Sequence, residues 1–135
     1  MSLVAYRPEY RIRVDEGRNQ LVYERLEELT LATTLPHYIS DFERALTYLR
    51  VGFTMLSDLR RTLGPNVQLI PVFLRKHELL LEAGIGIVAE VHPTAPTMRQ
   101  ISRVLREQSK LPVKLFTSRT EAEAFLEGYR LGLAS

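Results

Sequence analysis

The sequence contains no cysteine. This absence excludes disulfides, thiolate nucleophiles and every zinc or iron–sulfur site that depends on cysteine. A long apolar run is also missing: the N-terminal stretch lacks the apolar core of a signal peptide, and the most apolar segment, residues 85–89, is far too short to span a bilayer. These absences predict a cytoplasmic protein with no transmembrane segment, for which contact with a membrane surface stays open.

The sequence also lacks a large excess of charge of either sign. The 18 lysines and arginines nearly balance the 16 aspartates and glutamates, so the formal net charge is only +2. A protein with so small a net charge produces no general field that attracts nucleic acid, and we expect no nucleic-acid partner. Arginine supplies most of the basic groups, and its planar guanidinium recognises carboxylates and phosphates.

The chain has no low-complexity tract, no internal repeat and no linker rich in glycine, serine or proline. Its 135 residues, 45% of them hydrophobic, suit one ordinary globular domain. We therefore predict a single domain over residues 1–135, with its core in roughly residues 10–130. A domain of this size needs no metal or disulfide for stability, and we expect no cofactor.

An antiparallel hairpin is predicted near the N-terminus. Residues 10–14 alternate apolar and charged side chains, which is the period of a half-buried strand. A turn with Gly17 at its centre follows, and residues 21–23 begin a second strand. From Glu24 to Thr33 no clean period indicates where this second strand ends.

Further strands are predicted over residues 53–57, 85–91 and 113–116. Residues 85–91 carry apolar side chains at both odd and even positions, which point to opposite faces of a strand. This pattern indicates a strand buried on both faces at the centre of a sheet. Helices separate and follow these strands: one begins near Thr34, one spans residues 71–83 with Gly84 as its stop, one begins at Thr97, and one is capped by Ser118.

The predicted order of elements is therefore β-β-α-β-α-β-α-β-α. Alternating strands and helices favour parallel strands joined by right-handed crossovers, and the hairpin adds one antiparallel strand at an edge. We predict an α/β fold with a mixed, mostly parallel sheet of five strands packed with helices. An edge hairpin could template a homodimer, whereas the charges of Arg11 and Arg13 oppose such pairing, so monomer and homodimer both stay open.

Three segments of the chain, residues 52–60, 82–91 and 116–126, resemble the STAS domains of anti-sigma-factor antagonists and, more closely, the SpoIIAA-like bacterial proteins. The resemblance covers residues 10–130 in the order of elements. It implies a non-catalytic regulatory or protein-interaction module. Because these domains share a general shape with the lipid-binding SEC14 and CRAL-TRIO domains, it also implies an alternative, a binder or carrier of a small lipid-like or anionic ligand.

One segment departs from the pattern that the resemblance implies. Regulatory STAS domains carry a serine, phosphorylated by a partner kinase, at the start of the helix after the third strand. The corresponding stretch here, residues 62–67, contains no serine, and Thr62 lies before the turn. The resemblance therefore implies binding of a partner without a phosphorylation switch in this segment.

Polar side chains follow the ends of the predicted parallel strands, where the carboxyl ends of such strands meet and ligands bind. We expect the ligand or partner to meet an edge formed by Ser57, Asp58, Arg60, Arg61, His92 and Ser118. A carboxylate, guanidiniums, an imidazole and hydroxyls suit a polar or anionic head group. Val72 and Phe73 on the adjoining helix could receive an apolar tail.

A catalytic reading of the same edge is a remote alternative. Asp58, His92 and Ser118 contain the groups of a nucleophilic triad, but no Gly-x-Ser-x-Gly elbow is present and Ser118 has the position of a helix cap. We therefore expect no enzymatic activity. The three histidines are isolated from one another, so no metal site is expected either. A basic stripe of Arg99, Arg103 and Arg106 is the next candidate surface.

Overall fold

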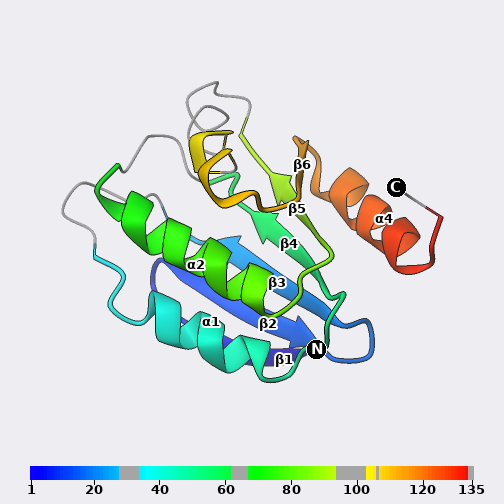
Figure 1. Ribbon diagram of the computed structural model, residues 1–135, viewed down its shortest axis with the longest axis horizontal. Helices are drawn as coiled ribbons and strands as arrows, with labels where there is room; N and C mark the ends of the chain where they lie inside the picture. Colours follow the sequence, from blue (N-terminus) through cyan, green and yellow to red (C-terminus); the bar gives the residue numbers. More distant parts are fainter. Residues whose placement is uncertain (28–33, 62–66, 94–102, 106, 134–135) are drawn as a thin grey trace.

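Six strands form one mixed sheet in the computed structural model, which describes residues 1–27, 34–61, 67–93, 103–105 and 107–133 (Figure 1). The strands lie side by side in the order of the sequence. The second strand is antiparallel to both the first and the third, and the last three strands run parallel to the third. They are β1 (Ser2–Tyr6), β2 (Tyr10–Asp15), β3 (Gln20–Arg25), β4 (Thr54–Asp58), β5 (Ile87–Val91) and β6 (Val113–Phe116).

The predicted α/β class and the mixed, mostly parallel sheet are confirmed, but the predicted number of strands is wrong by one. The strand that was missed is β1, which pairs with β2 and carries a bulge between Leu3 and Ala5. Leu3 is exposed and only Ala5 is buried in this strand, so its sequence has no alternation that indicates a strand. As a result β1, and not the hairpin with Arg11 and Arg13, forms the edge of the sheet. The oligomeric state stays a prediction.

The central place predicted for residues 85–91 is confirmed. β5 lies between β4 and β6, and its Val88, Ala89 and Val91 side chains are buried. The strand begins at Ile87 and not at Ile85, because the Ile85 N–H still donates to the carbonyl of Leu80 in the preceding helix.

Helices cover both faces of the sheet. The described helices are α1 (Tyr38–Leu46), the short 3₁₀ helix η1 (Val67–Leu69), α2 (Ile70–Glu82) and α4 (Arg119–Arg130). Residues 103–105 and 107–109 are helical as well. Figure 1 shows α1 and α2 side by side over one face, while α4 packs against β4, β5 and β6 on the other.

The helix boundaries agree with the sequence to different degrees. The helix predicted from Thr34 begins at Tyr38, because a turn closed by the Tyr38 N–H on the Leu35 carbonyl precedes it. The predicted stop at Gly84 is confirmed, since this glycine follows α2 with a positive φ of 84°. The helix start predicted at Thr97 lies outside the described residues.

An aromatic cluster forms the core between the sheet and the helices α1 and α2. Tyr10 and Tyr23 on the strands and Tyr38 and Phe42 on α1 are at most 1% exposed. Their ring centroids lie 4.9–5.9 Å apart in stacked, tilted and edge-on contacts. On the other face α4 packs Ala122 and Leu126 against the sheet, and Val22, Leu56, Ala89 and Val91 complete this second cluster.

A partly buried ionic network ties the N-terminal strands to α1. The carboxylate of Asp41 is fully buried and accepts hydrogen bonds from Nε and Nη2 of Arg7 at 3.0 Å, from the Tyr10 hydroxyl at 2.6 Å and from Nη2 of Arg44 at 3.1 Å. Burial by itself would raise the pKa of Asp41, but the hydrogen bonds from Arg7 and Tyr10 outweigh it and the pKa is lowered. Asp41 therefore stays ionised and holds α1 against β2.

We expect Asp41→Asn to lower the free energy of unfolding by about 2 kcal/mol, because the neutral amide loses the charge-assisted hydrogen bonds that Arg7 and Tyr10 donate to the buried carboxylate. Urea unfolding at neutral pH measures the change. Glu43→Gln, on the exposed side of the same helix, serves as the matched control and should change the value by less than about 0.5 kcal/mol. Equal effects of the two substitutions would contradict the structural role of Asp41.

His77 links the stability of the fold to pH. Its imidazole is 1% exposed, and its Nδ1 lies 2.6 Å from Oγ of Ser109, whose hydroxyl donates in turn to the carbonyl of Leu105. Burial, with a contribution from Lys76, lowers the pKa of His77 from 6.5 to about 3. Between pH 6.5 and pH 3 the imidazole is therefore protonated in the unfolded chain and neutral in the folded chain. The free energy of unfolding falls as the pH drops through this range.

Between pH 7 and pH 5.5 we expect His77 to remove about 1 kcal/mol from the free energy of unfolding. The lowered pKa values of Asp41, Glu24 and Asp58 act below this window, because their unfolded-state values are already acidic. His77→Asn keeps a polar group without a titrating ring, so its unfolding free energy should change much less between the two pH values. If the variant loses as much stability as the unchanged protein, His77 is not the group responsible.

Candidate functional site

The candidate site lies at the carboxyl ends of β3 and β4, on the face of the sheet that α4 covers in part. Glu24 near the end of β3 pairs in register with Asp58 at the end of β4. Side chains alternate across a strand, so these two carboxylates lie on the same face as Val22 and Leu56, which contact α4. Because α4 lies over β4, β5 and β6, the part of this face formed by β2 and β3 is left for polar side chains.

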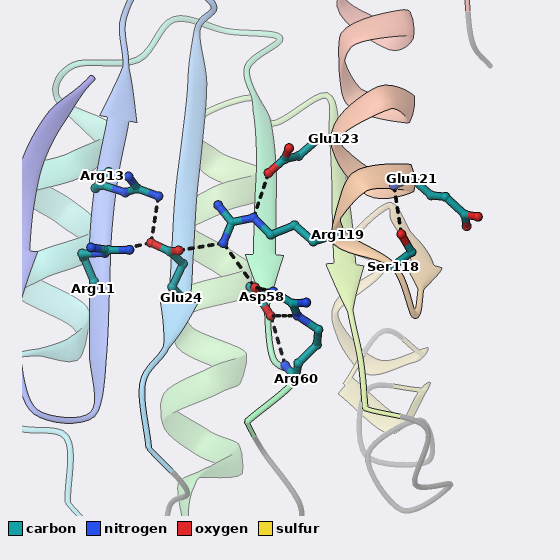
Figure 2. A network of polar contacts seen from close by, with 9 residues as sticks. All are labelled: Arg11, Arg13, Glu24, Asp58, Arg60, Ser118, Arg119, Glu121 and Glu123. Carbon is teal, nitrogen blue, oxygen red and sulfur yellow. Dashed lines mark hydrogen bonds and ion pairs between the residues drawn. The ribbon is translucent and has the colours of Figure 1, made fainter.

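Three arginines bind the carboxylate of Glu24 (Figure 2). Nε of Arg11 lies 2.9 Å and Nη2 of Arg13 lies 3.0 Å from Oε1, and Nη1 of Arg119 lies 2.7 Å from Oε2. Arg11 and Arg13 come from the neighbouring strand β2, where Arg11 pairs directly with Glu24. Both oxygens of Glu24 are therefore occupied by guanidinium groups of this chain.

The carboxylate of Asp58 is held in the same way. Arg60 donates to it through Nε at 3.0 Å, Nη2 at 2.7 Å and its backbone N–H at 3.2 Å. Nη1 of Arg119 reaches the second oxygen of Asp58 at 3.2 Å. The same guanidinium thus contacts both carboxylates, and its Nε also donates to Glu123 at 2.8 Å.

The start of α4 explains how Arg119 reaches this position. Ser118 is the N-cap, and its Oγ accepts the N–H of Glu121 at 3.3 Å. Arg119 is the first helical residue, so the cap fixes the direction in which its side chain leaves the helix. The predicted role of Ser118 as a helix cap is confirmed.

Electrostatics keeps both carboxylates ionised. Burial would raise the pKa of Glu24, but the hydrogen bonds from Arg11 and Arg119 outweigh it and the pKa is lowered. Burial would likewise raise the pKa of Asp58, but the hydrogen bonds from Arg60 bring this pKa below its ordinary value. Neither group is therefore poised to exchange a proton near neutral pH.

A pocket of about 430 Å³ opens beside these groups. We call it the arginine pocket, because five of its lining residues are arginines and only two are carboxylates. Its lining residues are Arg11, Glu24, Arg25, Leu26, Asp58, Arg60, Arg61 and Arg119. Arg61 is exposed, and its Nη1 donates to the carbonyl of Leu26 at 3.1 Å. Arg25 is buried and its Nε donates to the hydroxyl of Tyr23 at 3.0 Å.

The residues predicted at the strand edge divide into three groups. Asp58, Arg60 and Arg61 come together in the arginine pocket. Ser118 caps α4 and is not among the lining residues. Ser57 and His92 lie on the opposite face, because each is one residue away from a side chain that faces α4.

The groups on the opposite face are enclosed under the helices. Ser57 and His92 are each 1% exposed, and Nε2 of His92 lies 2.8 Å from Oε1 of Glu90. Oγ of Ser57 and Nδ1 of His92 have no hydrogen-bond partner in the described part of the chain and almost no accessible surface. A ligand therefore has no access to these two atoms in this conformation. The suggested triad of Asp58, His92 and Ser118 is not assembled, since its members are on different faces or occupied elsewhere.

Sequence reasoning missed Glu24, Arg11, Arg13, Arg25 and Arg119 as site residues. The signal for Arg11 and Arg13 was present, because they are the charged positions of the alternating segment predicted as a strand. Pairing the predicted hairpin would have placed Arg11 opposite Glu24. No local pattern indicates that Arg119 reaches a residue 95 positions earlier in the chain.

Comparison with known proteins found no matching family model, no similar curated protein and no similar solved structure. Within the described residues, no helix is long and apolar enough to cross a membrane. The same part of the chain contains no group of three or more histidines and carboxylates placed to hold a metal ion. The predicted segment without a phosphorylatable serine falls mostly in residues 62–66, outside the described residues, as do Arg99 and Arg106 of the basic stripe.

Arg119→Gln should lower the free energy of unfolding by about 1–2 kcal/mol, because Glu24 and Asp58 each lose a charged partner in a partly buried site. Arg130→Gln is the matched control on the same helix. Arg130 pairs only with Glu127 at the surface in the described structure, so its loss should cost less than about 0.5 kcal/mol. Chemical denaturation of both variants measures the difference, and equal values would show that Arg119 does not join α4 to the sheet.

Proposed function

We propose that this chain is a non-catalytic binding module that holds an anionic group of a small ligand in the arginine pocket. The observation that carries the proposal is the lining of the pocket, which contains five arginines and only two carboxylates at the carboxyl ends of parallel strands. This is the edge where open α/β sheets bind their ligands. A volume of about 430 Å³ lies within the range of small-molecule sites.

The chemistry of the lining favours binding over catalysis. The lining residues offer no hydroxyl, thiol, imidazole or amine that could act as a nucleophile or a general base. Glu24 and Asp58 have lowered pKa values and are saturated by arginines, so neither is suited to donate a proton. What the pocket does supply is guanidinium N–H groups, which bind carboxylates and phosphates in bidentate fashion.

We further propose that the module is of the SpoIIAA-like kind and acts in the cytoplasm as a regulatory protein. The order of strands and helices from β2 to α4 supports this proposal, together with the resemblance of residues 52–60, 82–91 and 116–126 to that family. In such a module the occupancy of the arginine pocket would replace phosphorylation of a serine as the signal. A concave, arginine-lined pocket favours a small anionic ligand over a broad protein surface as its direct occupant.

Anions should stabilise the protein through the arginine pocket. We expect sodium phosphate, sulfate and citrate to raise the melting temperature more than sodium chloride at equal ionic strength, because a ligand of the folded state alone stabilises it. Arg61→Gln should reduce this gain while leaving the melting temperature without anions nearly unchanged, since Arg61 is exposed and in the described structure binds only a backbone carbonyl.

Arg75→Gln is the matched control for this experiment. Arg75 lies on α2, is about as exposed as Arg60, and pairs with Glu78 away from the arginine pocket. The melting temperature of the Arg75→Gln variant should rise with each anion as much as that of the unchanged protein. Sulfate and phosphate also stabilise folded proteins without a specific site. The proposed function is therefore overturned if these anions stabilise the protein no more than chloride, or if Arg61→Gln keeps the whole gain.

A further inference from the structure

The arginine pocket has more hydrogen-bond donors than its own carboxylates can use. Each guanidinium carries five N–H groups and no acceptor. Both oxygens of Glu24 and both oxygens of Asp58 already accept from arginines of this chain. A ligand that enters the pocket must therefore bring acceptor oxygens of its own.

The charge of the lining sets how many negative charges the ligand should carry. The guanidinium of Arg25 lies on the opposite face of the sheet, against Tyr23 and Phe73, and is not counted. The other four guanidiniums of the lining face two carboxylates, which leaves an excess of two positive charges. The nearest contacts outside the lining do not change this excess, because Arg13 and Glu123 add one charge of each sign. A carboxylate would neutralise one of these charges, whereas a phosphomonoester brings a charge of about −1.5 to −2 and three terminal oxygens.

We propose that the arginine pocket binds the dianionic phosphoryl group of a phosphomonoester in preference to a carboxylate. This inference rests on the proposed function, since it names the class of anion that the pocket takes. The shared chemistry is a terminal phosphate on a small organic group, and it can belong to a soluble metabolite or to the head group of a lipid such as phosphatidic acid.

Arg61 is the residue with most capacity left for the phosphoryl group. In the described structure it forms no ion pair, and one of its N–H groups donates to the carbonyl of Leu26. Arg60 and Arg119, by contrast, already hold Asp58, and Arg119 also holds Glu24. Arg61 therefore supplies an exposed guanidinium at the open side of the pocket. Arg60 and Arg119 supply donors that are already held in place by Asp58 and Glu24.

The size of the pocket indicates a ligand larger than phosphate alone. A volume of about 430 Å³ leaves space beside the phosphoryl group for a small organic moiety. Leu26 is the apolar residue of the lining, so most of the wall that meets this moiety is polar. A short polar ester such as glycerol 3-phosphate fits these requirements and serves as the probe.

The test compares ligands that differ in the anionic group, using the full chain and isothermal titration calorimetry at pH 7.5. Glycerol 3-phosphate carries the phosphomonoester, glycerate carries a carboxylate on a similar skeleton, and methyl sulfate carries a tetrahedral group with a single charge. We expect glycerol 3-phosphate to bind at least tenfold more tightly than either of the other two. Arg61→Gln should weaken this binding at least tenfold, Arg61→Lys should weaken it less, and Arg75→Gln should leave it unchanged.

A second arm distinguishes a lipid source from a soluble one. Co-sedimentation with phosphatidylcholine vesicles, with and without phosphatidic acid, measures binding to the phosphomonoester on a membrane surface. Binding that needs phosphatidic acid and is lost in Arg61→Gln supports a lipid head group. Binding of glycerol 3-phosphate without binding to these vesicles supports a soluble ester.

The outcomes separate this inference from the proposed function. If glycerate binds as tightly as glycerol 3-phosphate, the preference for a phosphoryl group is wrong and the anion-binding function stands. If neither compound binds and no anion stabilises the protein, both proposals fail. If the folded variants Arg61→Gln and Arg61→Lys both bind glycerol 3-phosphate as tightly as the unchanged protein does, the phosphate lies outside the arginine pocket and the inference is overturned.

Discussion

Arg119 connects three elements of the fold through one guanidinium. It binds Glu24 of β3, Asp58 of β4 and Glu123 of its own helix at 2.7–3.2 Å. Two ionised carboxylates face each other in register on neighbouring strands, and without a cation between them they would repel each other in a partly buried site. The position of α4, the charge of the sheet edge and the shape of the arginine pocket all depend on this contact. It is available because Ser118 ends the preceding strand connection and caps the helix at the residue before Arg119.

The two faces of the sheet differ in how completely helices cover them. The face under α1 and α2 is closed by an aromatic cluster, and polar groups such as Ser57 and His92 are enclosed there with little access to solvent. The face under α4 is covered only over β4, β5 and β6, so the ends of β2 and β3 can carry charged side chains that contact both protein and water. A charged ligand therefore binds more readily on the second face. Some N–H groups of the arginines there donate to Glu24 and Asp58, which fixes the orientation of the guanidiniums, and the other N–H groups can donate to an incoming anion.

Most of the fold could be predicted from the sequence, because the strands from β2 to β6 carry either a clear alternation or a run that is apolar on both faces. β1 could not, since an edge strand that exposes Leu3 and Tyr6 has no such pattern. The rule that ligands bind at strand ends found Asp58, Arg60 and Arg61, but it locates an edge of the sheet and says nothing about the face. Ser57 and Asp58 are adjacent in sequence and lie on opposite faces for this reason. Arg119 joins residues far apart in the chain, and only the packing of α4 shows where its side chain ends.

The central claim, that an anion is held by the arginine pocket, is tested most directly by the arginine side-chain Nε–Hε signals in a nitrogen-15 NMR spectrum during titration with glycerol 3-phosphate. The account predicts that the signals of Arg60, Arg61 and Arg119 shift in parallel and saturate together, while the signal of Arg75 on α2 stays in place. Saturable shifts confined to arginines outside the lining of the pocket, such as Arg75, Arg103 or Arg130, would contradict it.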